Sequence, residues 1–392
     1  MEIEATYRVT SPLFLGGAEP TQAVELRPPS LKGLLRFWLR AVAWPRLGSW
    51  QAVAEVEERL FGSTRRQAAW HLSVRGVEGL VSVPAGELWE RQYGLAYLGY
   101  GVVEPQKIKR PYFREGGRFR LCLATRQTSS DTDDTDRRLL LAALTALGLL
   151  GGAGARARKG FGSLCLERLR CDREEVWEAP TTKEDLIGRL RTFLGALAVP
   201  REGSLPPYTA VGPQTKVWLV GQDRDARRLL DWLGRELLRY RSYGRAPRGR
   251  SEHQLPWGEV AEQNFADDHD LVIDFLQGQR VSRPPRRVVF GLPHNYFFGS
   301  TGRKVEIKPA GTGYDRRASP LFTHIHGLAS GEYTAVMTLL PAAFLPSGQR
   351  LVLETSRRRS AQVACRVDYS VIEDFFRRPA IAGRAVSVWP ES

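Results

Sequence analysis

Residues 151–163 read GGAGARARKGFGS, a glycine-framed segment directly after a long apolar helix candidate. Three cations, Arg156, Arg158 and Lys159, stand at its centre. Glycines allow positive φ angles and close backbone approach, successive N–H groups can form an anion nest, and the cations supply charge for phosphate oxygens. The segment therefore predicts contact with a polyanion. The alternative is a basic, glycine-rich turn between a helix and a strand.

Two commoner glycine motifs do not fit this segment. A Walker A loop needs Gly-Lys-Ser/Thr after its spacer, whereas Lys159 precedes Gly160, so the Mg²⁺-binding hydroxyl is missing from its place. Residues 152–157 satisfy the loose G-x-G-x-x-G/A pattern. A dinucleotide fingerprint, however, follows a strand and opens a helix, and here a helix comes first. The sequence thus excludes a P-loop and disfavours a dinucleotide site.

A better match is Gly152-x-Gly154, five residues, then Gly160-x-Gly162. This spacing is similar to the glycine-rich loop of the RAMP proteins, the ferredoxin-fold RNA-binding subunits of CRISPR effectors. Four further stretches closely resemble the first RAMP subunit of the Cmr complex, the type III-B CRISPR effector. They are TSPLFLGGA at 10–18, ELRPPSLKGLLRFWLR at 25–40, GLPH at 291–294 and RRASPL at 316–321. Residues 165–285 carry little that matches.

The resemblance implies an α+β fold with two ferredoxin-like (RRM-like, split β-α-β) domains, the second elaborated with insertions. We place these domains at 1–172 and 173–392, with a polar, proline-containing joint at about 171–185. The resemblance also implies no cofactor and a place at the end of a ribonucleoprotein filament, near the 3′ end of the guide RNA. The implied partners are guide (CRISPR) RNA, target RNA, and the other RAMP and small subunits of the effector.

The net charge of the chain has the sign expected for a protein that binds nucleic acid. The 392 residues contain 57 Lys and Arg against 43 Asp and Glu, a formal net charge of +14. A basic balance favours an acidic partner over a neutral metabolite. The four cysteines form no C-x-x-C pair and are too few for a disulfide framework. With no signal-peptide pattern in residues 1–20, and with 139–150 too short an apolar run to cross a bilayer, we expect a cytoplasmic protein without membrane contact.

Hydrophobic periodicity gives a coarse sequence of elements. Pro28, Pro29 and Ser30 predict a stop and an N-cap before a helix at 31–44. The acidic run 129–136 precedes the next helix, where N-capping and dipole complementarity explain it better than a divalent metal. The expected strands are 2–10, 70–76, 95–103, 118–125, 163–169, 215–221, 286–299, 318–327 and 332–340, and the expected helices are 31–44, 137–150 and 225–240.

Two other basic segments are candidates for RNA contact. Lys32, Arg36 and Arg40 line one face of the first helix at spacing i, i+4, i+8; the alternative is a solvated helix face. We expect this face to share one groove with the cations of residues 151–163. The insertion at 239–250 carries cations interleaved with tyrosines, which suits either RNA binding by charge and stacking or docking of a neighbouring subunit. Its residues are Arg239, Tyr240, Arg241, Tyr243, Arg245, Arg248 and Arg250.

Histidines raise the alternative of a metal-independent endoribonuclease that processes guide precursors, as some RAMP proteins do. His324 and His326 point to one face of a strand, where we expect two partly exposed side chains without a third metal ligand. His294, after Leu292 and Pro293, is expected to contact RNA or a neighbouring subunit. No convincing catalytic set emerges, and a general single-stranded nucleic-acid-binding protein remains a third alternative.

The favoured interpretation is a non-catalytic RNA-binding subunit that takes part in antiviral defence. Its candidate RNA-binding residues are Lys32, Arg36, Arg40, Gly154, Arg156, Arg158, Lys159, Gly160, Gly162, Arg241, Arg245, His294, Arg316 and Arg317.

Overall fold

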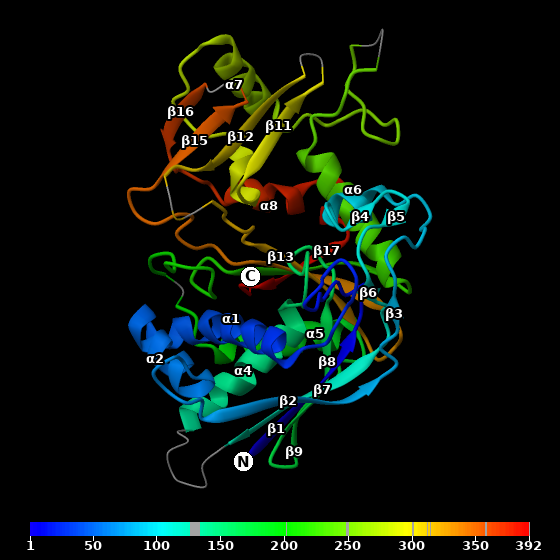
Figure 1. Ribbon diagram of the computed structural model, residues 1–392, viewed down its shortest axis with the longest axis vertical. Helices are drawn as coiled ribbons and strands as arrows, with labels where there is room; N and C mark the ends of the chain where they lie inside the picture. Colours follow the sequence, from blue (N-terminus) through cyan, green and yellow to red (C-terminus); the bar gives the residue numbers. More distant parts are fainter. Residues whose placement is uncertain are drawn as a thin grey trace.

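The computed structural model describes residues 1–125, 134–200, 202–247, 251–299, 302–311, 313, 315–356 and 359–391. Its elements stack in layers (Figure 1): a first sheet at the bottom, helices above it, a second sheet, further helices, and a third sheet at the top. Among the described residues, no helix is both long enough and apolar enough to span a membrane.

The first sheet has the order β2-β7-β1-β8-β9, with every neighbouring pair antiparallel. Alternation along β1 buries one face completely, since Ile3, Ala5 and Tyr7 have no exposed surface while the side chains between them are partly exposed. The strands are β1 (Glu2–Val9), β2 (Trp70–Glu78), β7 (Arg118–Thr125), β8 (Leu164–Cys171) and β9 (Glu174–Glu178).

Helices α1 and α4 lie between this sheet and the second one (Figure 1). The apolar stripe of α1, which includes Leu31, Leu35 and Trp38, is buried in the layer. The helix ends at Gly48, whose φ of 61° is the left-handed conformation that glycine adopts at helix ends. The helices of this layer are α1 (Pro28–Leu47), α2 (Trp50–Phe61), α4 (Asp134–Leu150) and α5 (Lys183–Ala196).

The second sheet has the order β13-β14-β10-β17 and is again antiparallel. Both of its faces are covered: Val217 and Leu219 pack toward α1 and α4, whereas Trp218 stacks on Phe376 of α8 with 3.8 Å between ring centroids. The elements are β10 (Lys216–Asp223), α6 (Ala226–Arg241), β13 (Leu321–Gly327), β14 (Tyr333–Leu339), α8 (Ser370–Arg377), α9 (Pro379–Ala382) and β17 (Ala385–Trp389).

The third sheet has the order β11-β12-β15-β16. Its inner face packs on a core that includes Phe275 of α7 and Phe290 of a short 3-10 helix, η1. Strand β11 lies at one edge, and its first residues reach down toward the second sheet (Figure 1). The elements are α7 (Ala266–Gln277), η1 (Arg286–Phe290), β11 (His294–Phe298), β12 (Arg303–Pro309), β15 (Arg350–Thr355) and β16 (Ser360–Ala364).

An insertion between β2 and β7 packs on α6 of the second half (Figure 1). Backbones touch there, because a Cβ on Gly94 would lie 1.8 Å from the Asp231 carbonyl oxygen and a Cβ on Gly234 would lie 2.3 Å from that of Gly94. The Asp231 carboxylate accepts hydrogen bonds from the backbone N–H groups of Gly94 and Leu95. The insertion comprises β3 (Ser82–Val83), α3 (Tyr93–Leu98), β4 (Val103–Glu104), β5 (Lys107–Ile108) and β6 (Tyr112–Phe113).

Most expected elements are confirmed. Helices α1, α4 and α6 stand where the apolar periodicity placed helices at 31–44, 137–150 and 225–240. Strands β1, β2, β7, β8, β10, β13 and β14 correspond to the expected strands 2–10, 70–76, 118–125, 163–169, 215–221, 318–327 and 332–340.

Three local predictions are wrong. The expected strand 95–103 is the helix α3 followed by a turn, because an apolar run buried on one helical side does not by itself distinguish helix from strand. The expected strand 286–299 begins as η1, and Gly291, with a φ of 122°, separates η1 from β11. Helix α1 starts at Pro28 rather than after a Ser30 cap, since proline fits a first turn whose N–H groups have no partner within the helix.

The acidic run 129–136 falls only partly on described residues. Its part up to residue 133 lies outside them. Asp134 and Asp136 belong to the first turn of α4, where a negative charge complements the helix dipole. Asp136 also accepts hydrogen bonds from Arg59 of α2, at 2.5 and 2.7 Å. The predicted dipole role therefore fits the two described aspartates.

Candidate nucleic-acid interface

The segment 151–163, called the glycine loop below, folds back on itself. Gly152 forms a bridge with Ser163, and the N–H of Ala153 donates to the carbonyl oxygen of Gly162 at 2.8 Å. Gly162 has a φ of 59°, and a Cβ there would lie 2.1 Å from the Ala153 oxygen. Gly154 has a φ of 79°, and a Cβ there would lie 2.4 Å from the Phe14 carbonyl oxygen. The glycines are thus required for the loop to pack against its own chain.

This loop is also built into the second sheet. Lys159 forms a parallel bridge with Thr323 of β13, whose N–H donates to the Arg158 carbonyl at 3.1 Å. Ile325 donates from its backbone N–H to Ser163 Oγ at 3.0 Å. A Cβ on Gly160, whose φ is 89°, would lie 2.6 Å from a methyl carbon of Leu230 in α6. The loop therefore joins the two halves of the chain.

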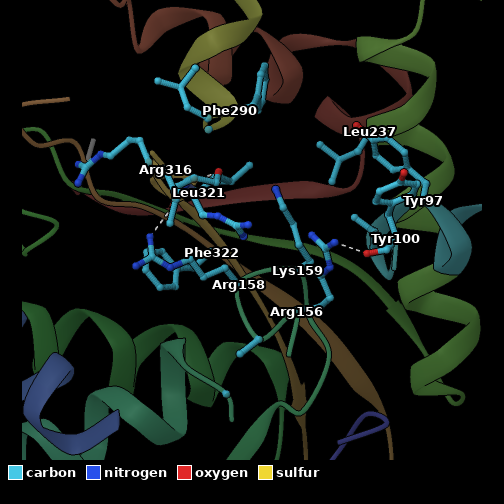
Figure 2. A pocket seen from close by; sticks show the side chains of 18 of the residues that line it. Tyr97, Tyr100, Arg156, Arg158, Lys159, Leu237, Phe290, Arg316, Leu321 and Phe322 are labelled. Atoms are coloured by element: carbon cyan, nitrogen blue, oxygen red, sulfur yellow. Dashed lines mark hydrogen bonds between the residues drawn. The ribbon is translucent and has the colours of Figure 1, made fainter. Parts of the chain in front are cut away.

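A cavity of about 880 Å³ opens where the loop meets the second half (Figure 2). Its floor is the glycine loop with Phe37 and Trp38 of α1. One wall comes from the α3 end and the last turns of α6, and another from the segments 290–295 and 316–322. The glycine loop and α1 of the first half, the insertion, and strands of the second and third sheets thus contribute to one concave site.

Among the described residues, six cations line this cavity together with His294, and no carboxylate does. Lys159 extends into the open space in Figure 2. Within the described part of the chain, five of the six cations form no ion pair; only Arg316, which is exposed, lies near a carboxylate, that of the adjacent Asp315 at 3.7 Å. The six are Arg156, Arg158, Lys159, Arg241, Arg316 and Arg317.

Neutral groups hold the arginines in place. Arg158 donates to the Ser319 carbonyl at 2.7 Å and lies over the Phe322 ring, 4.5 Å from its centroid. Arg241 donates to the Tyr97 hydroxyl at 2.7 Å and lies 4.3 Å from the Phe290 centroid. Arg156 donates to the carbonyl of Tyr100 (Figure 2). These contacts orient the guanidinium groups and leave their charges uncompensated.

Burial lowers the pKa values of four of the lining cations, Arg156, Arg158, Lys159 and Arg317. Burial, with Arg241, Arg156 and Arg158 nearby, lowers the pKa of Lys159 to about 7. Burial and the Arg317 charge lower the pKa of Arg158 to about 10. For Arg317 burial lowers the pKa as well, and its Nε and Nη2 atoms are buried without a hydrogen-bond partner. A bound anion would relieve both the repulsion and the missing hydrogen bonds.

Comparison with known proteins decides the family. A RAMP superfamily model matches residues 6–165. Over 183 residues the chain is 31% identical to the CRISPR system Cmr subunit Cmr1-2 of Pyrococcus furiosus, covering 41% of this chain and 92% of that protein. The chain belongs to the Cmr1 family of RAMP proteins. The resemblance found in the glycine loop and the N-terminal motifs is confirmed.

Two other relatives extend the comparison. Cmr1-1 of the same organism is 30% identical over 217 residues, which cover 50% of this chain and 62% of that protein. The crystal structure of apo Cmr1 from Pyrococcus furiosus superposes with a TM-score of 0.57 at 17% identity, covering 99% of both chains. The Cmr1 fold therefore extends over the whole chain, including residues 165–285, where motifs were scarce.

The basic face of α1 does not reach the cavity of this Cmr1 family member. Arg36 and Arg40 form ion pairs with Glu57 of α2, at 2.5 and 2.8 Å, and Glu57 is only 6% exposed. Lys32 is likewise absent from the lining residues. The shared groove expected between this face and the glycine loop is not formed, because α1 turns its other face, with Phe37 and Trp38, toward the cavity.

The basic insertion contributes one residue to the site. Arg241 lines the cavity, whereas Arg245 is exposed outside it, and its backbone pairs with Gln254. Arg239 forms ion pairs with Glu236 and Glu259. Arg248 and Arg250 lie outside the described residues. The two tyrosines make internal contacts, since Tyr240 is 5% exposed and Tyr243 stacks on His269 with 3.8 Å between ring centroids.

The expectation that His324 and His326 are partly exposed is wrong. Both are fully buried, because β13 is covered on both faces. They do share one face: His324 Nε2 lies 3.1 Å from His326 Nδ1, and His324 Nδ1 lies 2.7 Å from the Gly151 carbonyl. Burial lowers the pKa of His324 to about 4, so its ring is neutral. The described residues contain no group of three or more side chains suited to a metal ion.

Several aromatic residues of the site could not be recognised in the sequence. Tyr97 and Tyr100 come from a stretch expected to be a strand, and Phe290 from a stretch expected to continue into β11. Phe322 lies on β13 beside Arg158. Aromatic residues in apolar runs normally indicate a core, so only the three-dimensional arrangement reveals these rings beside cations.

Proposed function

We propose that this protein is the RNA-binding Cmr1 subunit of a type III-B CRISPR ribonucleoprotein, and that the cationic cavity holds phosphates of its RNA. The observation that carries the proposal is the set of six cations that line the cavity, with no carboxylate among the described lining residues. Burial lowers the pKa values of Arg156, Arg158, Lys159 and Arg317, and such cations suit a ligand that brings several negative charges at once. Exposed Arg156 and Arg316 extend the positive charge to the opening, as a continuous strand would require.

Guide RNA, target RNA and the sister RAMP and small subunits are the proposed partners. Two relatives are named as subunits of a CRISPR Cmr system, which supports these partners. The place at the filament end near the 3′ end of the guide belongs to the same proposal. Arginines that contact phosphates bind RNA of any sequence, because the phosphates carry no sequence information. Base pairing between guide and target would therefore supply the sequence specificity.

We propose that the chain consists of two ferredoxin-like domains. In the first sheet without β9, and in the second sheet, the first strand is followed along the chain by a helix, two more strands of that sheet, helical structure and a fourth strand, with the third sheet and the β2–β7 insertion as additions. The strand orders β2-β7-β1-β8 and β13-β14-β10-β17 place the first and third strands at the centre. This is the split β-α-β arrangement. Since β9 extends the first sheet, we place the boundary after Glu178 rather than at 172.

A guide-processing endoribonuclease is the second candidate, because His294 lies among the cations as a general base beside a phosphate would. We favour a non-catalytic role, since the described lining residues include neither a carboxylate nor a second histidine that could act as the acid. Burial, Arg241 and Arg287 hold the pKa of His294 well below its usual range. Cleavage of labelled repeat RNA by the isolated protein without metal, lost in His294→Ala, would establish the enzyme instead.

The test of the proposed function is purification of the protein from its host, followed by sequencing of bound RNA. We expect guide-length RNAs that share a repeat-derived end, together with sister subunits. Arg158→Gln combined with Arg317→Gln should reduce the RNA recovered per protein. The matched control, Arg138→Gln with Arg377→Gln, removes the same charge at exposed helix positions that form local ion pairs. Recovery of unrelated RNA, or of none, would contradict the proposal.

A further inference from the structure

Large aromatic side chains of the described residues are rarely exposed, and the exposed ones are unevenly distributed over the surface. Among the described residues, three aromatic side chains are more than half exposed: Trp50 at 59%, Phe297 at 64% and Tyr100 at 77%. Trp50 begins α2, outside the cavity lining. Tyr100 lines the cavity, and Phe297 lies two residues beyond Asn295, which also lines it. Tyr100 thus belongs to the site, and Phe297 follows its lining residues on the same strand.

Strand β11 leads from the cavity to Phe297. His294 and Asn295 line the cavity, and the strand then runs outward along the edge of the third sheet (Figure 1). Because side chains alternate along a strand, Asn295 and Phe297 share a face, and His294 and Phe297 are separated by about 10 Å. The ring is therefore within reach of the next nucleotides of a strand that leaves the cavity.

The surroundings of Phe297 suit an unpaired base. Its register partner on β12 is Lys304, which is exposed and forms no ion pair within the described residues. The carboxylate nearest in register is Glu306, opposite Asn295, and it lies 3.9 Å from Lys308. An exposed ring beside a free cation is the combination by which proteins bind single strands, the ring stacking on a base and the cation contacting the backbone.

Tyr100 offers a second ring on a different wall. It follows α3 in the insertion, and its carbonyl accepts the hydrogen bond from Arg156 (Figure 2). The contact between Gly94 and Gly234 anchors that insertion on α6. The ring is therefore exposed on a fixed backbone, adjacent to a cation of the cavity.

We propose that Tyr100 and Phe297 are base-stacking platforms for unpaired nucleotides on either end of the cavity-bound segment, so that single-stranded RNA runs from one ring, across the cations, to the other. The proposal rests on the proposed function, because it assigns the path of the same RNA. It adds a ligand class for the two rings, the faces of unpaired bases, and predicts that double-stranded RNA is excluded from both positions.

The experiment measures binding of fluorescent single-stranded RNA to the purified full chain by anisotropy. Tyr100→Ala and Phe297→Ala should each weaken binding about 5-fold to 100-fold, and Trp50→Ala, which removes an equally exposed ring elsewhere, should leave it unchanged. Phe297→Trp, which keeps an aromatic ring at this position, should bind RNA with the affinity of the wild type. A 2-aminopurine placed along the RNA should show quenched emission at positions that stack, and this quenching should disappear in the matching alanine variant.

An abasic nucleotide supplies an independent check. If Phe297 stacks on a particular base, removal of that base should weaken RNA binding by the same factor as Phe297→Ala. The two changes together should weaken binding no more than either change alone. Wild-type affinity in both alanine variants would overturn the inference while leaving the cavity proposal intact. Failure of the wild-type chain to bind RNA at all would count against the proposed function itself. Loss of subunit assembly with unchanged RNA affinity would assign Phe297 to a protein contact and overturn its stacking role.

Discussion

Lys159, in the glycine loop of the first half, pairs through its backbone with Thr323 on an edge strand of the second half, and its side chain extends into the cavity between them. The pairing fixes Arg158 as well, since the Thr323 N–H donates to the Arg158 carbonyl at 3.1 Å. The cations of the loop are therefore held by backbone hydrogen bonds rather than by a flexible turn. The geometry of the site depends on this junction between the halves.

Lys159 should make RNA binding depend on pH. Its pKa is lowered to about 7 by burial and by the neighbouring arginines, so the free protein loses this charge as the pH rises through that value. Phosphate favours the charged amine and raises its pKa, so affinity should fall between about pH 6 and about pH 8.5, with proton uptake on binding. Calorimetry in buffers of different ionisation enthalpy measures that uptake, and Lys159→Met should abolish it.

Protein stability should show the opposite trend with pH. The unfolded state keeps the ordinary lysine pKa and binds more protons than the folded state between about pH 7 and about pH 10. The contribution of Lys159 to the free energy of unfolding therefore rises with pH through this window. Denaturant titrations should show that Lys159→Met removes the rise. An identical pH dependence in wild type and variant would contradict the assigned environment of the amine.

Arg36 and Arg40 should matter for folding more than for RNA binding. Replacing both by alanine leaves Glu57 buried without its ion pairs, and we expect a loss of about 2 kcal/mol or more in the free energy of unfolding. RNA affinity of the folded fraction should change little. Adding Glu57→Gln to the double variant should recover part of the stability. If RNA affinity falls steeply while stability is unchanged, this helix face contacts RNA after all.

Gly162 should be intolerant of any side chain. Gly162→Ala would place a Cβ 2.1 Å from the Ala153 oxygen at a φ of 59°, and we expect a destabilisation of about 2 kcal/mol or more, with weakened RNA binding. Gly188→Ala in α5 is the matched control, because nothing lies within 4 Å of its Cβ position. That change should stabilise the chain by about 0.5–1 kcal/mol. Equal melting temperatures for the two variants would refute the packing role of the loop glycines.

Gly234 tests whether the insertion shapes the cavity. Gly234→Ala adds a Cβ 2.3 Å from the Gly94 oxygen, which should push α3 away from α6 and move Tyr97 and Tyr100. Hydrogen exchange should accelerate in residues 79–117, and RNA affinity should fall. Gly33→Ala, at an open position of α1, should alter neither. Unchanged exchange in the insertion would show that this glycine contact does not fix it.

Local sequence patterns predicted much of the fold, for reasons visible in particular elements. Alternation along β1 and β7 and the apolar stripes of α1 and α6 reflect one buried face each, which periodicity detects. Helix α4 is instead marked by a continuous apolar run, and its last two turns are buried on all sides. Helix α3 escaped detection because Leu95 and Leu98 form too short a stripe. The sequence also could not reveal that β13 is covered on both faces, and so the burial of His324 was missed.

The candidate site was predicted in part. The glycine loop and the 316–321 motif supplied Arg156, Arg158, Lys159, Arg316 and Arg317, because both carry their signal in consecutive residues. Arg36 was misassigned to the same groove, since its partner Glu57 lies on another helix, and ion pairs between distant residues leave no local pattern. The aromatic residues of the cavity could not be predicted either, because their proximity to the cations also leaves no local sequence pattern.

The central claim is that the unpaired cations of the cavity bind RNA phosphates, and the salt dependence of binding tests it most directly. The logarithm of the association constant for single-stranded RNA is measured against the logarithm of salt concentration for wild type and for Arg158→Gln with Arg317→Gln. We predict a slope smaller by about 1.4 in the double variant, about 0.7 for each lost phosphate contact, and the wild-type slope in Arg138→Gln with Arg377→Gln. The same slope in all three proteins would contradict the account.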